Sequence, residues 1–354
     1  MNEINVVNEA LVRSLTEVRG CLSSKKTTTA RRRHPDSEDE DLLIPNIDPF
    51  LIDAEMKIAQ SRAVRRMLDK TQVMTNSGNL HIRKRITHCG EVTANAVFIS
   101  AILGLNVELA RAIALAHDIG HPPFGHDGEA FLNKVSGEGR PFLHEIMGVV
   151  IAQHIERCGK GLNLTKQVLL GIMRDAWSDP NTTPPFSEEA KVVMWADRFA
   201  YVTGDYNDMI RIEYPVSDEL KKLMTGLGAN QRERVNRLIT ALCVESAAEG
   251  QVCFEQSEVA QKFLQIKKLM YGIYPMLNSS NAVSILERIY EFVQKIHPTV
   301  DATILLALMT DHDVVYLASQ PVLDYSHFQQ VTVAELIPFL REREIRWWEP
   351  DLEW

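Results

Sequence analysis

The amino-acid sequence predicts an all-α fold. From residue 44 onward apolar side chains recur at helical spacing, and the alternation typical of strands is scarce. The proline pairs at 122–123 and 184–185 interrupt this pattern in the way that loops do. A hydrophobic fraction of 45% in 354 residues is enough for a sizeable core. We therefore expect a helical bundle that contains most of the chain.

The predicted helices follow one another along the chain and are separated by short polar segments. An amphipathic helix is expected within residues 1–20, followed at 22–41 by a charged segment with opposite-sign blocks, which we expect to be mobile. The later ranges with helical spacing are 53–73, 88–103, 107–117, a helix that begins near His126, about 142–157, and 188–210.

Three parts are expected along the chain. Residues 1–43 form the N-terminal helix and the mobile charged linker, and residues 44–215 form a core that carries the chemical motifs. Residues 216–354 form a helical C-terminal region with few chemical signals, packed on that core.

Composition and charge exclude several classes of protein. The net charge of −9 argues against a general nucleic-acid-coating protein, because such binding depends on many Lys and Arg side chains. No uninterrupted run of about 18 apolar residues is present, so we expect no membrane span, and the acidic, mixed N-terminus does not read as a secretory signal. Five scattered cysteines without a CxxC pair fit reduced thiols. These features predict a cytoplasmic protein.

Two histidines and two aspartates have the setting of metal ligands. His88 lies on one predicted helix, His117-Asp118 ends the next, and Asp197 lies among apolar side chains on a third. Two imidazoles and two carboxylates with open positions suit a divalent Mg, Mn, Co, Fe or Ni ion better than a structural zinc. The alternative is that each is a satisfied polar residue of the core. A third His-Asp pair, at 312–313, has no companion motif and is interpreted as a helix start.

Longer phrases surround these residues and carry a resemblance to a known family. They are SRAVRRMLDKTQV (61–73), KRITHCGEV (84–92), AHDIGHPPFGHDGEAFL (116–132), GLNLT (161–165) and ADRFAYVTGDYNDMIR (196–211). The sequence from about 48 to 211 thereby resembles the deoxyguanosinetriphosphate triphosphohydrolase branch of the HD-domain phosphohydrolases. The resemblance implies an HD-domain helical bundle with additional C-terminal helices. It also implies hydrolysis of a deoxynucleoside 5′-triphosphate to the deoxynucleoside and inorganic triphosphate.

The resemblance also implies roles for individual residues. By the motif match His88, His117, Asp118 and Asp197 bind the metal, and His126 and Glu129 are the acid–base pair. Arg85, His121 and His144 match phosphate-facing positions, and Gln72, Tyr201 and Asp205 match positions that touch the sugar. At 198 many bacterial members have an acid, whereas Arg198 here adds a positive charge that could reach the polyphosphate.

The residues themselves support these roles less sharply. Residues 62–85 contain seven basic side chains and one acid, which suits a polyanionic substrate but is also typical of a solvated helix face. His126 and Glu129 are three residues apart, so a helix places them on one face, where a carboxylate would raise the pKa of the histidine. Asp197, Tyr201 and Asp205 share another helical face, and Tyr201 against the sugar would disfavour a 2′-hydroxyl.

Two other functions stay open. One is an HD-type phosphatase or 5′-nucleotidase that acts on nucleoside monophosphates, and the other is a regulatory protein that senses dNTP without turnover. A nucleic-acid role is not favoured, but the basic segment 62–85 keeps it open. Relatives form hexamers or tetramers, which implies a homo-oligomer. The tryptophans at 347, 348 and 354 are expected to be buried, against the core or against a neighbouring subunit.

Overall fold

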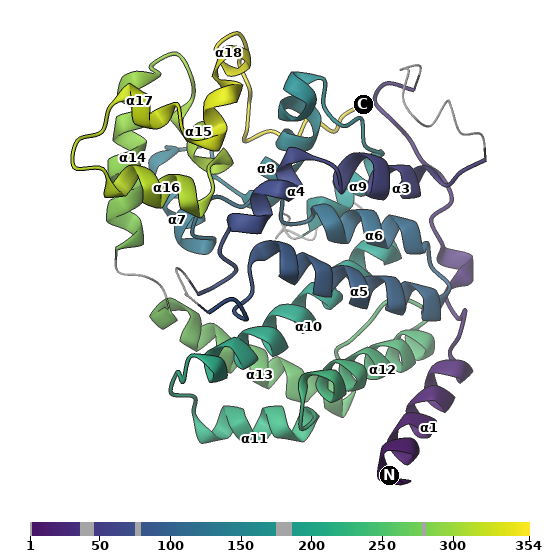
Figure 1. Cartoon of the computed structure of the whole chain (residues 1–354). Helices are drawn as coiled ribbons and strands as arrows, with labels where there is room; N and C mark the ends of the chain where they lie inside the picture. Colours follow the sequence, from purple (N-terminus) through teal and green to yellow (C-terminus); the bar gives the residue numbers. More distant parts are fainter. Residues whose placement is uncertain (1, 36–45, 75–78, 175–185, 278–280) are drawn as a thin grey trace. The chain divides into compact units, whose positions relative to one another are not determined.

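The computed structural model of the chain describes residues 2–35, 46–74, 79–174, 186–277 and 281–354. Within these ranges all extended regular structure is helical, and two isolated β-bridges occur without any strand (Figure 1). The all-α prediction is therefore confirmed. The chain divides into two compact units, and each unit combines three separate segments. The predicted parts 1–43, 44–215 and 216–354 are consecutive along the chain, whereas each compact unit is built from separate segments. The predicted division therefore stays a prediction.

The first unit comprises residues 1–29, 90–114 and 184–276. Its core includes a cluster of aromatic rings in which Phe199, Phe254 and Phe263 meet one another at centroid distances of 5.0 to 5.9 Å. Its helical elements are α1 (Asn2–Glu17), η1 (Ser23–Lys25), most of α5 (Arg85–Leu103) and of α6 (Val107–Ala116), α10 (Glu188–Arg211), α11 (Asp218–Leu227), α12 (Gln231–Glu249) and α13 (Glu258–Leu277).

The second unit comprises residues 30–89, 115–183 and 277–354, and it holds most of the predicted chemical motifs. Within it α14 packs against α7, α15 and α16. Its helical elements are α3 (Pro49–Leu51), η2 (Ile52–Ile58), α4 (Arg62–Arg66), η3 (Met67–Asp69), α7 (His126–Val135), α8 (His144–Val150), η4 (Ile151–Ile155), η5 (Glu156–Gly159), α9 (Lys166–Ile172), α14 (Ala282–Ile296), α15 (Ala302–Leu308), α16 (Asp311–Ser319), α17 (Tyr325–Phe328), η7 (Thr332–Leu336) and α18 (Ile337–Leu340).

The long predicted helices are present close to their expected bounds. They correspond to α1, α5, α6, α7 and α10, and the range 142–157 corresponds to α8 followed by a π-helical turn, η4. Helix α10 begins where Ser187 accepts a hydrogen bond from the backbone N of Ala190. Helix α16 begins with a capping box between Thr310 and Asp313. The interpretation of the 312–313 pair as a helix start is therefore confirmed.

The range 53–73 is not one helix, although its apolar spacing is helical. A π-helical turn, η2, ends at Ile58, and Ser61 then caps a new short helix, α4. The buried carboxylate of Glu156 accepts hydrogen bonds from the backbone N atoms of Arg62 and Ala63. The start of α4 therefore depends on a partner almost a hundred residues away in the sequence. The apolar spacing of residues 53–73 gives no indication of that partner.

The described part of the charged segment makes specific contacts, and its expected mobility stays a prediction. In the first unit Thr27 donates two hydrogen bonds to Glu189. In the second unit Arg32 forms an ion pair of 2.7 Å with the fully buried Asp53 and donates to the carbonyl of Asn163. Residues 36–45 of the predicted linker lie outside the described residues. A buried carboxylate needs such partners, so Arg32 has a structural role.

The tryptophans near the C-terminus take different positions. Trp347 is buried within the second unit, and its indole N–H donates to Asp301 at 2.8 Å. Trp348 packs under the guanidinium of Arg140, 4.2 Å from the ring centroid. Of the two expected alternatives, burial against the core and burial against a neighbouring subunit, Trp347 shows the first.

Among the described helices α5 is long and apolar enough to cross a membrane. Helices α15 and α16 reach that length only if the bent pair is counted as one span. This is weak evidence, because core helices can be equally long and apolar. Helix α5 begins with the buried polar residues Arg85 and His88. The expectation of no membrane span stays a prediction.

The buried ion pair of Arg32 and Asp53 generates a prediction about stability. Asp53→Ala leaves the guanidinium of Arg32 buried without its carboxylate, and we expect the free energy of unfolding to fall by about 3 kcal/mol. The matched control is Arg33→Ala, which removes the exposed pair with Asp351 and should cost about 0.5 kcal/mol or less. Urea unfolding measures both values, and equal losses would show that the Asp53 pair has no special structural role.

Candidate active site

A tight turn after α6 brings the His117-Asp118 pair against α8. The turn contains Gly120, and a side-chain carbon there would lie 1.9 Å from the carbonyl oxygen of His144 and 2.3 Å from the backbone N of Gly148. No larger residue fits this approach. The glycine of the HDIG phrase therefore places the start of α8 beside Asp118.

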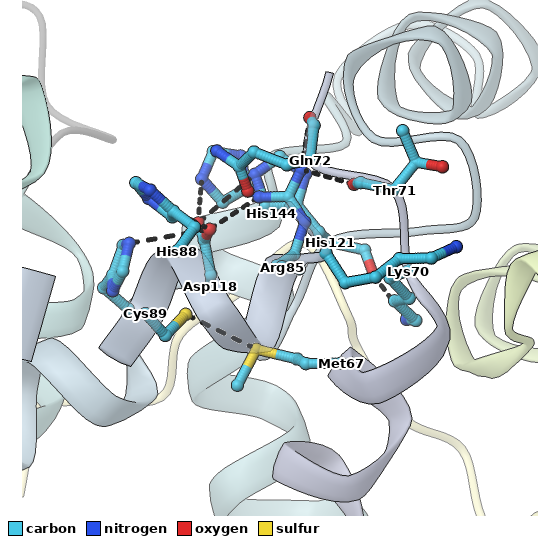
Figure 2. Close-up of polar contacts among 12 residues, drawn as sticks. Met67, Lys70, Thr71, Gln72, Arg85, His88, Cys89, Asp118, His121 and His144 are labelled. Carbon is cyan, nitrogen blue, oxygen red and sulfur yellow. Dashed lines mark hydrogen bonds and ion pairs between the residues drawn. The ribbon is translucent and has the colours of Figure 1, made fainter. Parts of the chain in front are cut away.

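The carboxylate of Asp118 lies at the centre of the site, with a different pair of imidazoles at each oxygen (Figure 2). Nε2 of His88 and of His117 lie 3.9 and 3.5 Å from Oδ2. Nε2 of His121 and of His144 lie 3.4 and 3.9 Å from Oδ1. Asp118 is only 4% exposed, so these neighbours form its environment in place of solvent.

Arg85 supplies the positive charge that this buried carboxylate requires. Its Nη1 donates to Oδ2 of Asp118 at 2.6 Å, and its Nη2 donates to the carbonyls of Thr71 and Gln72. Burial alone would raise the pKa of Asp118, but Arg85 and the histidines His117 and His121 hold it well below its usual range. Asp118 is therefore ionised, as a metal ligand must be.

One side of Asp118 fits a divalent metal ion. The ligand atoms of His88, His117 and Asp118 all lie within 4.8 Å of one another, and they combine nitrogen and oxygen donors. This mixed donor set is the one preferred by ions of the Mn, Fe, Co and Ni kind, and it leaves coordination positions open. Three of the four predicted ligands are thereby brought together.

The other side of Asp118 is positively charged. Glu129 accepts hydrogen bonds at 2.9 Å from both the backbone N and Nδ1 of His144. Burial alone would lower the pKa of His144, but Glu129 and Glu145 raise it to about 10, so the ring is an imidazolium at neutral pH. His121 stacks on this ring with centroids 3.6 Å apart. Burial, Arg85 and His144 together lower the pKa of His121 well below its usual range, so His121 is neutral.

The partner of Glu129 differs from the one expected. Helical spacing placed Glu129 beside His126, but its hydrogen bonds go to His144, and the ring of His126 instead meets His121 edge-on at 5.3 Å. Burial, Arg85 and His144 lower the pKa of His126, and Glu129 opposes this effect only in part. The expected rise in the pKa of His126 is therefore wrong. The carboxylate acts on His144 because α8 begins directly opposite it.

Several polar atoms around Asp118 are available to a ligand. Within the described chain the buried atoms Oε1 of Gln72, Nδ1 of His121 and Nε of Arg85 have no hydrogen-bond partner from the protein. All three side chains point to the same region in Figure 2. Buried polar groups are normally satisfied, so this concentration favours a site that a polar ligand completes.

The remaining predicted residues lie on α10, in the first unit. Asp205 is buried and accepts a hydrogen bond of 2.9 Å from the hydroxyl of Tyr274, and the hydroxyl of Tyr201 lies 3.0 Å from that of Tyr271. Asp197 and Arg198 are half-buried on the same helix, and Arg198 lies over the ring of Trp195. The shared helical face is as predicted, whereas the ligand role of Asp197 stays a prediction.

The sequence analysis missed the tyrosines of α13. Tyr271 and Tyr274 are three residues apart on a helix, a spacing that places both on one side. Each hydroxyl lies at hydrogen-bonding distance from a predicted sugar-facing residue of α10. The three-residue spacing of these tyrosines could have indicated a shared helix face. The sequence around them does not indicate that this face packs against α10.

Comparison with known proteins supports the family resemblance. The HD-domain family model matches residues 85–202. A deoxyguanosinetriphosphate triphosphohydrolase-like protein of Clostridium tetani is 38% identical over 204 residues, which is 57% of this chain and 57% of that protein. A protein of the same description from Clostridium perfringens strain SM101 is 35% identical over 253 residues, which is 69% of this chain and 73% of that protein. This chain belongs to the deoxyguanosinetriphosphate triphosphohydrolase-like family.

The HD-domain match and these relatives support a phosphohydrolase of the HD-domain class. The matched parts span between just over half and about three quarters of the two relatives' own lengths. The HD-domain match begins at Arg85 and includes the whole His88, His117 and Asp118 cluster. The metal-binding class is thereby supported by both the family and the geometry.

The histidine cluster generates a prediction about metal content. His117→Ala removes one of the three clustered ligands, and we expect the protein to lose its stoichiometric Mn²⁺ on dialysis. The matched control is His126→Ala, which changes a histidine of the same region that is not in this ligand group. Elemental analysis after equilibration with Mn²⁺ and dialysis measures both. Equal metal content in the two variants would contradict the assignment of His117.

Proposed function

We propose that this phosphohydrolase hydrolyses deoxynucleoside 5′-triphosphates to the deoxynucleoside and inorganic triphosphate. The observation that supports this function best is that the two carboxylate oxygens of Asp118 face chemically different groups. A metal-type ligand group faces one carboxylate oxygen, and a positively charged histidine stack faces the other. A polyphosphate bound between them would meet a cation on one side and hydrogen-bond donors on the other, as phosphoryl-transfer chemistry requires.

The proposed metal ligands are His88, His117, Asp118 and Asp197, and the ion is a divalent Mg, Mn, Co, Fe or Ni. When bound there, such an ion polarises a phosphoryl oxygen and lowers the pKa of a bound water. Asp118 supports the ligand set because its charge is already held ionised by Arg85.

The proposed phosphate-binding residues are Arg85, His121, His144 and Arg198. Arg85 and the imidazolium of His144 supply fixed positive charge beside the buried Asp118, where charge is screened little. His121 has a buried ring nitrogen, Nδ1, without a protein partner, and it can donate to a phosphate oxygen in the tautomer that carries the proton on Nδ1. These groups hold a substrate with about four negative charges in one orientation before reaction, which is where most of the catalytic effect of such sites arises.

His126 is the proposed proton donor to the leaving oxygen, and Glu129 is the carboxylate of this acid–base pair. Burial and the positive groups Arg85 and His144 lower the pKa of His126. A bound triphosphate brings negative charge next to the ring and reverses that effect, because an opposite charge favours the protonated form. Glu129 contributes through His144, whose position and charge it fixes.

The proposed sugar-binding residues are Gln72, Tyr201 and Asp205. Gln72 offers a buried amide oxygen, and Asp205 is held in place by Tyr274. The ring of Tyr201 against the sugar would exclude a 2′-hydroxyl by contact. We therefore propose that Tyr201 makes the enzyme selective for deoxynucleotides over ribonucleotides.

Two further properties are proposed with this function. We place the protein in the cytoplasm and expect a homo-oligomer, a hexamer or a tetramer, as the family resemblance implies. A nucleic-acid role receives less support, because other cations of the basic segment are engaged within the second unit: Arg62 with Glu335, Arg66 with Glu156 and Lys84 with Asp69.

Product analysis tests the proposed function directly. The Mn²⁺-loaded protein is incubated separately with the four dNTPs and the four NTPs, and products are separated by ion chromatography. We expect tripolyphosphate and the deoxynucleoside in equal amounts from dNTPs, and little product from NTPs. Orthophosphate as the sole inorganic product would support a phosphatase, and dNTP binding without any product would support a sensing protein. Either result contradicts the proposal.

Two substitutions separate metal binding from proton transfer. Asp197→Ala should remove both the metal and the activity, because a four-ligand site loses one carboxylate. His126→Ala should retain the metal and dNTP binding but lower kcat by about 100-fold or more, since it removes the proton donor. Metal analysis and steady-state kinetics measure both. Full metal content in Asp197→Ala, or an unchanged kcat in His126→Ala, would refute the corresponding role.

A further inference from the structure

A single aspartate of the C-terminal region joins two segments of the proposed site. Asp311 is the first residue of α16 and is 7% exposed. Its Oδ1 accepts a hydrogen bond of 2.9 Å from the backbone N of Phe124. Its Oδ2 accepts from the backbone N of Thr71 at 2.9 Å and from the hydroxyl of Thr71. All three donors thus belong to segments far away in the sequence.

Each of these segments carries proposed substrate-binding residues. Thr71 directly precedes Gln72, and Phe124 lies in the loop that joins His121 to His126. Backbone contacts at Thr71 and Phe124 therefore determine where the side chains of their neighbours lie.

The loop that contains Phe124 depends on outside contacts for its shape. Phe124 has a φ of +60° and Gly125 a φ of +57°. A non-glycine residue in this region is strained and persists where its surroundings hold it. A side-chain carbon at Gly125 would lie 3.1 Å from Nη2 of Arg85 and 3.3 Å from the carbonyl of Gln72. The loop and the Gln72 segment therefore pack directly against each other.

A buried lysine ties the same segments from another direction. Lys70 is 1% exposed, and its Nζ donates to the carbonyl of His121 and, at 2.9 Å, to the carbonyl of Ala307. Ala307 lies in α15, directly before the turn that leads to Asp311. Figure 2 shows Lys70 and Thr71 on the segment that runs alongside the Asp118 cluster. The loop from His121 to Phe124 is thus connected to the C-terminal region at both ends.

We propose that Asp311 is a positioning residue that holds the Gln72 segment and the loop before His126 in the arrangement that binds substrate. The inference rests on the proposed function, since it acts through residues assigned to the sugar and to proton transfer. It gives the C-terminal region, which carries few chemical motifs in the sequence, a direct part in the geometry of the site.

The same helix provides a matched control for this role. Asp313 is 3% exposed, and it also accepts three hydrogen bonds, from the backbone N atoms of Thr310 and Thr332 and from the hydroxyl of Thr332. Its partners lie in the C-terminal region and include neither Thr71 nor Phe124. Asp311 and Asp313 are therefore alike in burial and in number of donors and lie in the same first turn of α16. They differ in the segments they hold, and Asp313 also closes the capping box.

The test compares Asp311→Asn with Asp313→Asn. An asparagine keeps the size of the side chain but turns an amide donor toward backbone donors, so one set of hydrogen bonds is lost in each variant. Both variants should lose thermal stability. Per bound metal ion, Asp311→Asn should lower kcat/KM for dNTP by about 100-fold, with a raised KM and a lowered kcat. Asp313→Asn should keep the wild-type kcat and KM.

Hydrogen–deuterium exchange provides a readout that does not depend on turnover. Peptides that cover residues 70–73 and 121–127 should exchange faster in Asp311→Asn than in the wild type. In Asp313→Asn the exchange rates of these peptides should equal those of the wild type. If the wild-type protein releases no tripolyphosphate, the proposed function fails, whereas the exchange result still tests the positioning role. Equal exchange of these peptides in both variants would overturn it.

A milder variant guards against loss of folding in Asp311→Asn. Thr71→Val removes the hydroxyl donor to Asp311 and keeps the backbone N–H, and Thr71→Ser keeps both donors. We expect a reduced kcat/KM in Thr71→Val and near-wild-type kinetics in Thr71→Ser. Wild-type kinetics in Thr71→Val together with wild-type kinetics in Asp311→Asn would show a merely structural contact.

Discussion

The buried carboxylate of Asp118 is the interaction on which the rest of the site depends. A lone charge at this depth would cost several kcal/mol, so the fold must supply compensating partners. Arg85 from the start of α5 donates a short hydrogen bond, and four imidazoles surround the two oxygens. The start of α5, the turn after α6 and the start of α8 must therefore meet at one place. Gly120 allows that meeting, because a side chain there would overlap α8.

This requirement also explains why the two sides of Asp118 differ chemically. His144 is held by the carboxylate of Glu129, which keeps its ring charged, whereas burial, Arg85 and His144 together keep the stacked His121 neutral. One buried anion is therefore shared between two groups of ligand-type atoms, and the group of His121 and His144 differs in carrying an imidazolium. Such sharing allows metal and phosphate to be held side by side in a small volume.

The sequence predicted the parts of this site that local spacing determines and not those that depend on tertiary contacts. The helices from α5 to α7, and the convergence of His88 with His117-Asp118, follow from helical periodicity and a specific phrase. The pairing of Glu129 with His144 does not, because the i,i+3 rule pointed to His126 and only the fold brings α8 opposite α7. The break at Ser61 was missed for the same reason, since the decisive carboxylate, Glu156, is distant in sequence.

The C-terminal region illustrates how a motif can be correctly interpreted and still undervalued. Reading the 312–313 pair as a helix start was right, because Asp313 does cap α16. One residue before this pair, Asp311 uses the same helix start to bind Thr71 and Phe124, more than 180 positions away. A buried acid at a helix N-terminus satisfies its charge with backbone N–H groups, and nothing in the local pattern states whose N–H groups those are. The functional content of this region therefore lies in its tertiary hydrogen bonds, and sequence motifs alone make it look like passive packing.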